Sequence, residues 1–179
     1  MANILLAVTG SISAYKAADI TSQLTKLGHQ VKVLMTPAAT AFITPLTLQV
    51  LSKQAVLVEV MTEEDPKQIQ HIDLGKEADL FLVAPASANT IAKLAHGFAD
   101  NIVTSTALAL PSEVKKFLAP AMNTKMLDHP ATQNNLETLK SYGYQIIPPR
   151  EALLACGYQG AGALATVDTI VQTIKENCL

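Results

Sequence analysis

Asp79-Leu-Phe-Leu-Val-Ala-Pro-Ala-Ser-Ala-Asn-Thr90 is the stretch that decides the fold. Residues 80–84 form an unbroken apolar run that is too short for a helix and shows no alternation. Such a run is typical of a central parallel strand with both faces buried. Pro85 cannot donate to a sheet ladder, so we expect the strand to stop there. A helical pattern then starts at Ile91, which predicts a strand, a turn and a helix in succession.

The turn after this strand has two interpretations. Ser87, Asn89 and Thr90 place hydroxyls and N–H groups at the carboxyl end of a strand and the amino end of a helix. Such a place suits a phosphate or another electron-rich ligand. The alternative is that Ser87 or Asn89 only caps the following helix. The stretch alone leaves both interpretations open.

The same alternation of strands and helices continues on either side of this stretch. We predict strands at residues 3–8, 30–35, 56–60, 80–84, 114–119 and 144–147, with helical patterns between them. Alternation of this kind indicates a parallel sheet with right-handed crossovers and helices on both faces. The sequence therefore predicts a doubly wound, Rossmann/flavodoxin-like, three-layer α/β fold with a six-stranded parallel sheet, as a single domain over residues 1–179. Residues 148–162, which are rich in proline and glycine, predict a mobile loop or flap.

Composition narrows the classes of partner. The net charge is −2 and no basic run exceeds Lys115-Lys116, which argues against nucleic acid and anionic membranes. The hydrophobic fraction of 49% is high for one small core, so we expect buried subunit interfaces and a homo-oligomer. No segment approaches the roughly 20 apolar residues of a transmembrane helix.

The cysteines and the N-terminus indicate the compartment. The first ten residues lack a positively charged region and predict a strand rather than a signal peptide. Without a secretory signal, Cys156 and Cys178 are expected to be reduced thiols in the cytoplasm. No His, Cys and carboxylate residues show metal-ligand spacing, so we expect no metal site.

Four loops are predicted to meet at the carboxyl edge of the sheet, where such folds bind ligands. They are Gly10–Ser13, Thr36–Phe42, Pro85–Thr90 and Pro120–Met126, and they are small and hydroxyl-rich with almost no charge. The sequence contains no G-x-G-x-x-G after the first strand and no G-x-x-x-x-G-K-[ST] motif, and Ser87 is not in G-x-S-x-G. Hydroxyls and N–H groups without Lys or Arg would suit the phosphate of FMN.

Five segments occur together in a fixed order. They are Gly10-Ser-Ile-Ser-Ala-Tyr-Lys16, His71-Ile-Asp-Leu74, Pro85-Ala-Ser-Ala-Asn-Thr90, Pro120-Ala-Met-Asn-Thr-Lys-Met126 and Leu154-Ala-Cys-Gly-Tyr-Gln-Gly160. In this combination the chain resembles the homo-oligomeric flavin-containing cysteine decarboxylases, and the resemblance spans nearly its whole length.

The resemblance implies roles for particular residues. FMN would lie between subunits as cofactor, in contact with Gly10, Ser11, Ile12, Thr36, Ser87, Ala88, Asn89, Thr90 and Ala121. His71 would be the active-site base, and Asn123 would bind the carboxylate that leaves as CO2. Met126 would contact the substrate, and Cys156 would donate the proton of the reductive half-reaction.

The resemblance also implies a reaction. It is the FMN-dependent decarboxylation of 4′-phosphopantothenoylcysteine to 4′-phosphopantetheine in coenzyme A biosynthesis. The cysteinyl CH2–SH is oxidised to a thioaldehyde, which gives the electrons a sink when CO2 leaves, and the resulting enethiol is re-reduced by the flavin. The family forms trimers, sometimes four of them in a dodecamer. Because nothing follows Leu179, we expect the ligase that makes the substrate to be a separate chain.

Two departures leave the shape of the substrate site open. Leu127 follows Met126 where the family often has tryptophan, and Lys76 stands where an arginine is common. Without the resemblance, His71 and Asn123 are ordinary helix caps, and Cys156 is a small buried residue or an idle thiol.

Four other functions are compatible with parts of the pattern. A peptidyl-cysteine oxidative decarboxylase would stop at the enethiol and have no use for Cys156. A non-catalytic flavin-binding regulatory relative would lack His71, Asn123 or Cys156, all of which are present. A flavodoxin-like electron carrier should be more acidic, and a flavin prenyltransferase should have basic phosphate ligands, of which the sequence offers few.

Overall fold

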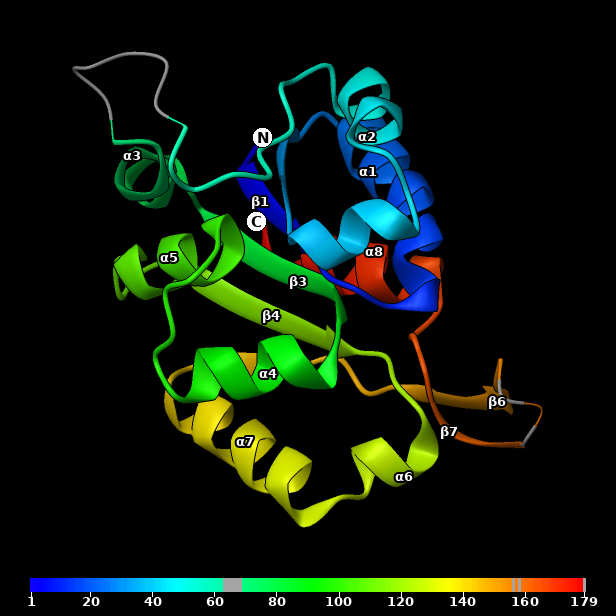
Figure 1. The fold of residues 1–179 in the computed structure, drawn as a ribbon. Coiled ribbons are helices and arrows are strands. Elements are labelled where there is room, and N and C mark those ends of the chain that lie inside the picture. Colours follow the sequence, from blue (N-terminus) through cyan, green and yellow to red (C-terminus); the bar gives the residue numbers. More distant parts are fainter. Residues whose placement is uncertain (63–68, 156, 158, 179) are drawn as a thin grey trace.

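The computed structural model describes residues 1–62, 69–155, 157 and 159–178. Figure 1 shows a central sheet with helices on both faces. The sheet has five parallel strands in the order β2-β1-β3-β4-β5. These strands are β1 (Asn3–Val8), β2 (Gln30–Met35), β3 (Leu80–Ala86), β4 (Lys115–Pro120) and β5 (Tyr144–Ile146).

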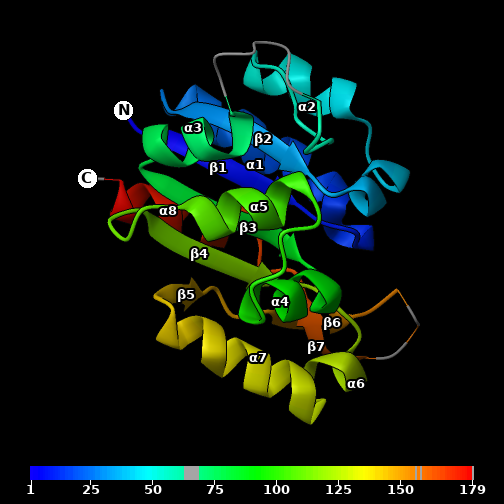
Figure 2. The ribbon, with the colours of Figure 1, turned by 60° about the vertical axis from the view of Figure 1, so that its left-hand side comes forward.

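The helices form two layers, one on each face of the sheet (Figures 1 and 2). One layer contains α1 (Ala17–Lys26), α2 (Pro45–Ser52) and α8 (Val167–Asn177), and the other α3 (Gln70–Glu77), α4 (Ala88–Ala95), α5 (Ile102–Ala109) and α7 (Pro130–Ser141). Short helical turns follow three of the strands: η1 (Ile12–Lys16), η2 (Pro37–Ala41) and α6 (Thr124–Leu127). Within the described ranges, none of the helices has both the length and the apolar character needed to cross a bilayer.

Alternate residues of each strand pack on opposite faces, as the pleat of a strand requires. Ile4, Leu6 and Val8 of β1 lie in the core under α1 and α8. Leu5 and Ala7 lie in the second core, under α4 and α5. Every residue of β3 is buried, so the unbroken apolar run correctly predicted a strand covered on both sides.

The strand order fixes where a ligand can bind. From β1 the chain runs outward to β2, then returns across the sheet to β3 and continues outward to β4 and β5. The direction of winding therefore reverses between β1 and β3. In doubly wound sheets a crevice opens outside the carboxyl ends of the strands at this switch point. The four predicted loops follow β1, β2, β3 and β4 at this edge.

The prediction of a sixth strand at residues 56–60 is wrong. Leu57 forms one isolated parallel bridge with Leu34 on the free edge of β2. It donates its N–H to the carbonyl of Val33 at 3.0 Å and accepts from the N–H of Met35 at 2.8 Å. The pairing extends no further among the described residues. Residues 56–58 and 60 are half-buried apolar side chains, so this apolar run reflects packing on the edge of the sheet rather than a ladder.

The prediction that Pro85 ends the strand is also wrong. The strand β3 includes Pro85 and ends at Ala86, which pairs with Pro120 of β4. The register shifts between Val83 and Ala86, so the proline lies in an irregularity of the ladder. Proline is tolerated in sheets at such irregularities, because no ladder bond is then required of it.

The segment at residues 148–162, predicted to be a mobile loop or flap, contains regular strands. Its described residues form an antiparallel hairpin of β6 (Arg150–Leu153) and β7 (Gln159–Ala163). Two hydrogen bonds anchor β7 to the chain after β4: the N–H of Met122 donates to the carbonyl of Gly162 at 2.9 Å, and Thr124 Oγ1 donates to the carbonyl of Ala161 at 2.6 Å. Long-range bonds of this kind, which composition does not reveal, hold the segment in place.

Gly162 makes this anchor possible. Its φ of +126° is open to glycine but strained for other residues. A Cβ atom at this position would lie 2.2 Å from the carbonyl oxygen of Met122, which belongs to the backbone and cannot rotate away. Only a residue without a side chain lets the two backbones approach.

We therefore expect Gly162→Ala to destabilise the protein by more than the ~1–2 kcal/mol that a left-handed backbone costs an L-residue. The matched control is Gly143→Ala, at φ +87° with nothing within 4 Å of an added Cβ, which should cost only the backbone strain. Urea denaturation followed by far-UV circular dichroism measures both. Equal free energies of unfolding for the two variants would show that the hairpin is not anchored as described.

Candidate functional site

A pocket of about 490 Å³ opens at the carboxyl edge of the sheet, beside the switch point. This volume lies in the range of cofactor and small-molecule sites. Its walls come from the β1–η1 loop, the start of α4, the β4–α6 loop and the β6–β7 hairpin. The pocket thus lies where the strand order predicted a crevice.

The Thr9 hydroxyl fixes the backbone that leads into Ser87, a residue of the pocket wall. Thr9 is fully buried, and its Oγ1 donates to the carbonyl of Pro85 at 2.6 Å and accepts from the N–H of Ser87 at 2.9 Å. One side chain thus replaces ladder bonds where the register of β3 shifts. Because of these two bonds, the chain leaves the sheet at Ser87, directly before α4.

Two other contacts place the loops around the pocket. A Cβ on Gly10 would lie 2.7 Å from the Cβ of Ala38, so only glycine lets the β1–η1 loop approach η2. Ser11 caps η1 by accepting from the N–H of Ser13 at 3.3 Å. The loops after β1 and β2 therefore meet at the wall of the site.

Ser87 both caps a helix and lines the pocket. Its Oγ accepts from the N–H of Thr90 at 3.3 Å, so the capping interpretation is confirmed. Ser87 and Ala88 also lie on the pocket wall. Ser87 therefore serves both as the helix cap and as a lining residue. The first N–H groups of a helix have no carbonyl one turn earlier to bind, and they favour a negative charge.

Asn123 and Met126 lie at the end of β4. Asn123 caps α6, accepting from the N–H of Lys125 at 2.9 Å, so here too the capping interpretation is confirmed. Both residues line the pocket together with the β1–η1 loop. The two substrate contacts that the resemblance implied therefore share one wall.

The structure brings together some of the predicted site residues. Those that line the pocket are Gly10, Ser11, Ile12, Ser87, Ala88, Ala121, Asn123 and Met126. Thr36, Asn89, Thr90 and His71 do not line it within one protomer. Cys156 lies outside the described residues, and its predicted role stays a prediction.

Thr36 is the most informative of the residues beside the pocket. It is the N-cap residue of η2 at the carboxyl end of β2, and it is buried. Its Oγ1 has no hydrogen-bond partner among the described residues. A buried hydroxyl without a partner carries a desolvation cost, which a ligand oxygen would remove.

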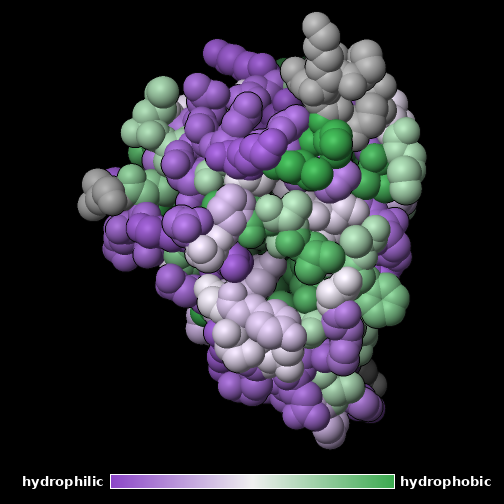
Figure 3. Space-filling view, turned by 90° about the vertical axis from the view of Figure 1, so that its left-hand side faces the viewer, coloured by the Kyte–Doolittle hydropathy of each residue, from purple (hydrophilic) through white to green (hydrophobic). Residues whose placement is uncertain are grey.

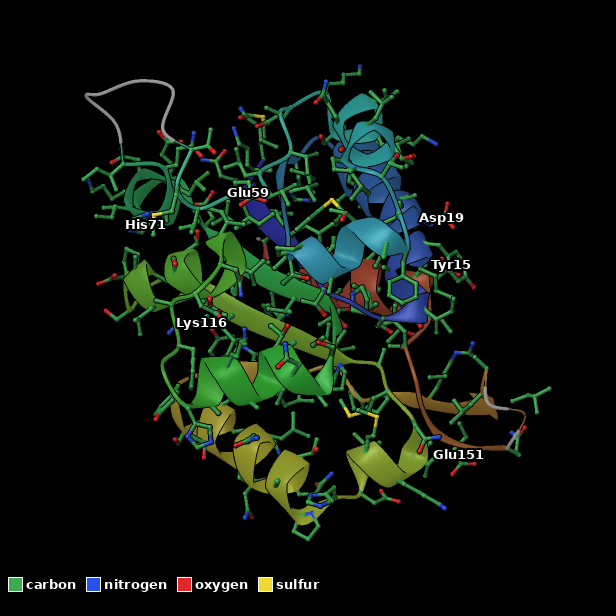
Figure 4. The ribbon with its side chains drawn as sticks, in the orientation of Figure 1. Tyr15, Asp19, Glu59, His71, Lys116 and Glu151 are labelled. Atoms are coloured by element: carbon green, nitrogen blue, oxygen red, sulfur yellow. The ribbon has the colours of Figure 1, made fainter. Side chains whose placement is uncertain are left out.

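His71 lies far from the pocket in the same chain. It is the second residue of α3, and Figure 4 shows it on the opposite side of the molecule from Tyr15, which lines the pocket. Its Nδ1 is buried without a partner among the described residues. One protomer therefore does not combine His71 with the residues of the pocket.

The two departures from the family pattern have structural roles. Lys76 forms an ion pair with Asp73 at 2.9 Å on the surface of α3, which lowers the pKa of the Asp73 carboxyl. Leu127 is buried in the core between α6 and α7. Neither side chain lies in the pocket.

Sequence reasoning missed two charged residues at the site. Lys16 ends η1 and Arg150 begins β6, and both line the pocket. Burial, followed by the charge of Arg150, lowers the pKa of the Lys16 ammonium. Lys16 belongs to a quoted motif, but nothing local in the sequence shows that the hairpin brings Arg150 to the same pocket.

These features define a class of protein: a flavodoxin-like α/β protein with a site for a phosphate-bearing ligand at its switch point. Comparison with known families identifies the family within this class. The family model described as Flavoprotein matches residues 1–179. The chain belongs to the Flavoprotein family.

Two relatives show how far the similarity extends. The probable phosphopantothenoylcysteine decarboxylase of Streptococcus mutans is 67% identical over 173 residues, which cover 97% of each chain. The coenzyme A biosynthesis bifunctional protein CoaBC of Bacillus subtilis is 46% identical over 175 residues. That alignment covers 98% of this chain but only 43% of the bifunctional protein.

Two solved structures have the same fold. A cysteine-to-serine mutant of PPC decarboxylase, complexed with pantothenoylaminoethenethiol, matches with a TM-score of 0.88 and 32% identity, covering 98% of this chain and 97% of that chain. The FMN-dependent cysteine decarboxylase SpaF matches with a TM-score of 0.85 and 29% identity, covering 100% of this chain and 98% of that chain.

The Thr9 hydroxyl can be tested directly. Thr9→Val keeps the shape of the side chain but leaves the Pro85 carbonyl and the Ser87 N–H without their partner. We expect a loss of ~1–3 kcal/mol in the free energy of unfolding, because both groups remain buried or half-buried. Urea denaturation measures it, with Thr9→Ser as the control that keeps the hydroxyl. Equal stability of the valine variant and the wild type would contradict the role of Thr9.

Proposed function

We propose that this chain is an FMN-dependent decarboxylase that converts 4′-phosphopantothenoylcysteine to 4′-phosphopantetheine in coenzyme A biosynthesis, acting in the cytoplasm as a single-domain protein. The observation that carries the proposal is the pocket at the switch point, which Asn123 and Met126 line together with the hydroxyl-rich loops after β1 and β3. The similarity to the phosphopantothenoylcysteine decarboxylase of Streptococcus mutans over 97% of both chains supports the same reaction.

The residues around the pocket fit FMN. Ser11, Ser87 and the start of α4 supply hydroxyl and N–H donors without a carboxylate, and the unpartnered Thr36 Oγ1 lies at the end of the neighbouring strand. Donors of this kind suit a phosphate. Gly10, Ile12, Ala88, Asn89, Thr90 and Ala121 would complete the contacts. When bound, FMN would accept a hydride from the cysteinyl CH2–SH group and later return it.

The chain's own residues would bind the substrate and move protons. Asn123 would bind the departing carboxylate, and Met126 would contact the substrate. His71 would remove a proton as the general base, since a ring nitrogen of a neutral imidazole can accept one. Cys156 would donate a proton in the reductive half of the reaction.

The distance between His71 and the pocket supports a site that is shared between subunits. If His71 acts at the pocket, it must come from a second protomer. The surfaces around α3 and around the pocket are different parts of the molecule, so the contact would be heterologous. Heterologous contacts close into rings when the rotation allows it, as in a trimer or in a dodecamer built from four trimers.

The distribution of apolar surface supports the same assembly. Figure 3 shows apolar side chains gathered at the centre of the face that carries α3 and α5. Ile69, Phe98 and Leu108 are exposed apolar residues from the segments around these helices. Ile12, Tyr15 and Phe42 are exposed at the pocket itself. Exposed apolar patches of this kind are typical of interaction surfaces.

The reaction has a direct test. Purified protein reconstituted with FMN should release CO2 from 4′-phosphopantothenoylcysteine and give 4′-phosphopantetheine, with no net oxidation by mass spectrometry. Cys156→Ser should still release CO2 but accumulate a product lighter by two hydrogens. Saturated product from this variant at the wild-type rate would remove Cys156 from the mechanism. Absence of FMN binding by the wild type would overturn the proposed function.

The shared site predicts complementation between two inactive variants. His71→Asn and Asn123→Ser should each be inactive as homo-oligomers. When the two chains are co-expressed in equal amounts, about a quarter of the sites should combine an intact His71 with an intact Asn123, so activity should return to that fraction. Differently tagged chains and native mass spectrometry establish that mixed oligomers form.

The control pairs His71→Asn with the double variant His71→Asn/Asn123→Ser. Neither chain has an intact histidine, so the mixture should stay inactive whether the site lies within one protomer or between two. Mixed oligomers of the two single variants that remain without activity would show that His71 does not serve a neighbour's pocket.

A further inference from the structure

The charged side chains that line the pocket are all cationic. Of the residues that line it, Lys16 and Arg150 are the charged ones, and no described carboxylate lies among them. They come from distant parts of the chain, one at the end of η1 and the other at the start of β6. Arg150 is also the single arginine of the sequence. Two cations thus meet at a pocket that is otherwise uncharged.

No acid compensates these two cations among the described residues. The ion pairs in that part of the chain join Lys76 to Asp73, Lys93 to Asp100 and Lys140 to Glu137. Arg150 is instead oriented by a bond from its Nε to the carbonyl of Leu164 at 3.2 Å. The Lys16 Nζ lies 5.9 Å from the centroid of the Tyr15 ring.

The arrangement is unfavourable unless an anion completes it. Lys16 is half-buried, and its lowered pKa reflects both burial and the repulsion from Arg150. Like charges that are brought together and partly removed from water raise the free energy of the folded state. A phosphate bound between them would replace the repulsion by two charge-assisted interactions, and a guanidinium suits phosphate oxygens well.

We propose that Lys16 and Arg150 bind the phosphate of the substrate at the pocket and thereby select a phosphorylated substrate over a peptide with a C-terminal cysteine. This inference rests on the proposed function. The hairpin that carries Arg150 is anchored to the segment after β4, which carries Asn123 and Met126. Arg150 is therefore attached to the side of the pocket that carries Asn123 and Met126, and Lys16 lines the same pocket from the end of η1. The neutral donors at the ends of β1 and β3 suit the phosphate of FMN.

The test compares 4′-phosphopantothenoylcysteine with unphosphorylated pantothenoylcysteine. For Lys16→Met and for Arg150→Gln, the ratio of kcat/KM for the phosphorylated over the unphosphorylated substrate should fall roughly tenfold to a hundredfold, the range for losing one charged hydrogen-bonding partner. The lower kcat/KM for the phosphorylated substrate should come mainly from a higher KM, with kcat little changed. Lys16→Arg and Arg150→Lys keep the charge and should restore most of the ratio. The matched control is Lys26→Met, an exposed lysine in the last turn of α1 that should leave the ratio unchanged.

Equilibrium titrations separate the two phosphates and do not need turnover. In FMN-loaded protein, 4′-phosphopantothenate should bind more tightly than pantothenate, and both variants should abolish this preference. The affinities of the apoprotein for FMN and for riboflavin should not change. A selective loss of FMN affinity would assign the pair to the cofactor's phosphate and overturn the proposal, as would an unchanged substrate ratio. If decarboxylation is absent but the preference for 4′-phosphopantothenate depends on both residues, the anion site stands and the proposed reaction fails.

Discussion

The Thr9 hydroxyl is the interaction on which the site depends. Parallel strands are held together by ladder bonds, and a proline near the end of a central strand removes one of the donors. Thr9 supplies the missing connections from its side chain, binding the backbone on both sides of the position where β3 leaves the ladder. The β1–β3 pair therefore stays closed at its carboxyl end while the chain turns away into α4. The position of Ser87 at the pocket wall and the start of α4 both depend on this one buried group.

Neutral and charged groups around the pocket come from different elements of the fold. The ends of β1 and β3 offer hydroxyls and N–H groups, which are rigid because they belong to the sheet and to helix starts. The cations Lys16 and Arg150 stand at η1 and at the hairpin, outside the sheet. Neutral dipoles bind a phosphate at short range but attract it weakly from a distance. Cations also attract an anion while it approaches the pocket. The inner donors are thus suited to a resident cofactor, and the outer cations to a ligand that exchanges.

The sequence predicted those parts of the fold that depend on local pattern. A buried run such as residues 80–84 specifies a strand because burial on both faces requires apolar residues throughout. Residues 56–60 were misleading because a short apolar run also suits a segment that only packs on a sheet edge. The hairpin was missed because its order comes from bonds to Met122 and Thr124, which are distant in sequence. The proximity of Lys16 and Arg150 was missed for the same reason, and the roles of His71 and Cys156 rest on family resemblance, since a lone histidine or cysteine carries no signal of its own.

The bond between Met122 and Gly162 has a mechanical consequence. It joins strand β7 to the loop that carries Asn123, with the two backbones too close for any side chain to lie between them. The hairpin and this loop form one body, so outward movement of the hairpin either breaks the bond or draws the loop along. In the second case the pocket wall formed by the hairpin and the wall that carries Asn123 move together. Departure of product and relaxation of the binding wall would then be a single event, with no stage in which an open cleft still holds its ligand tightly.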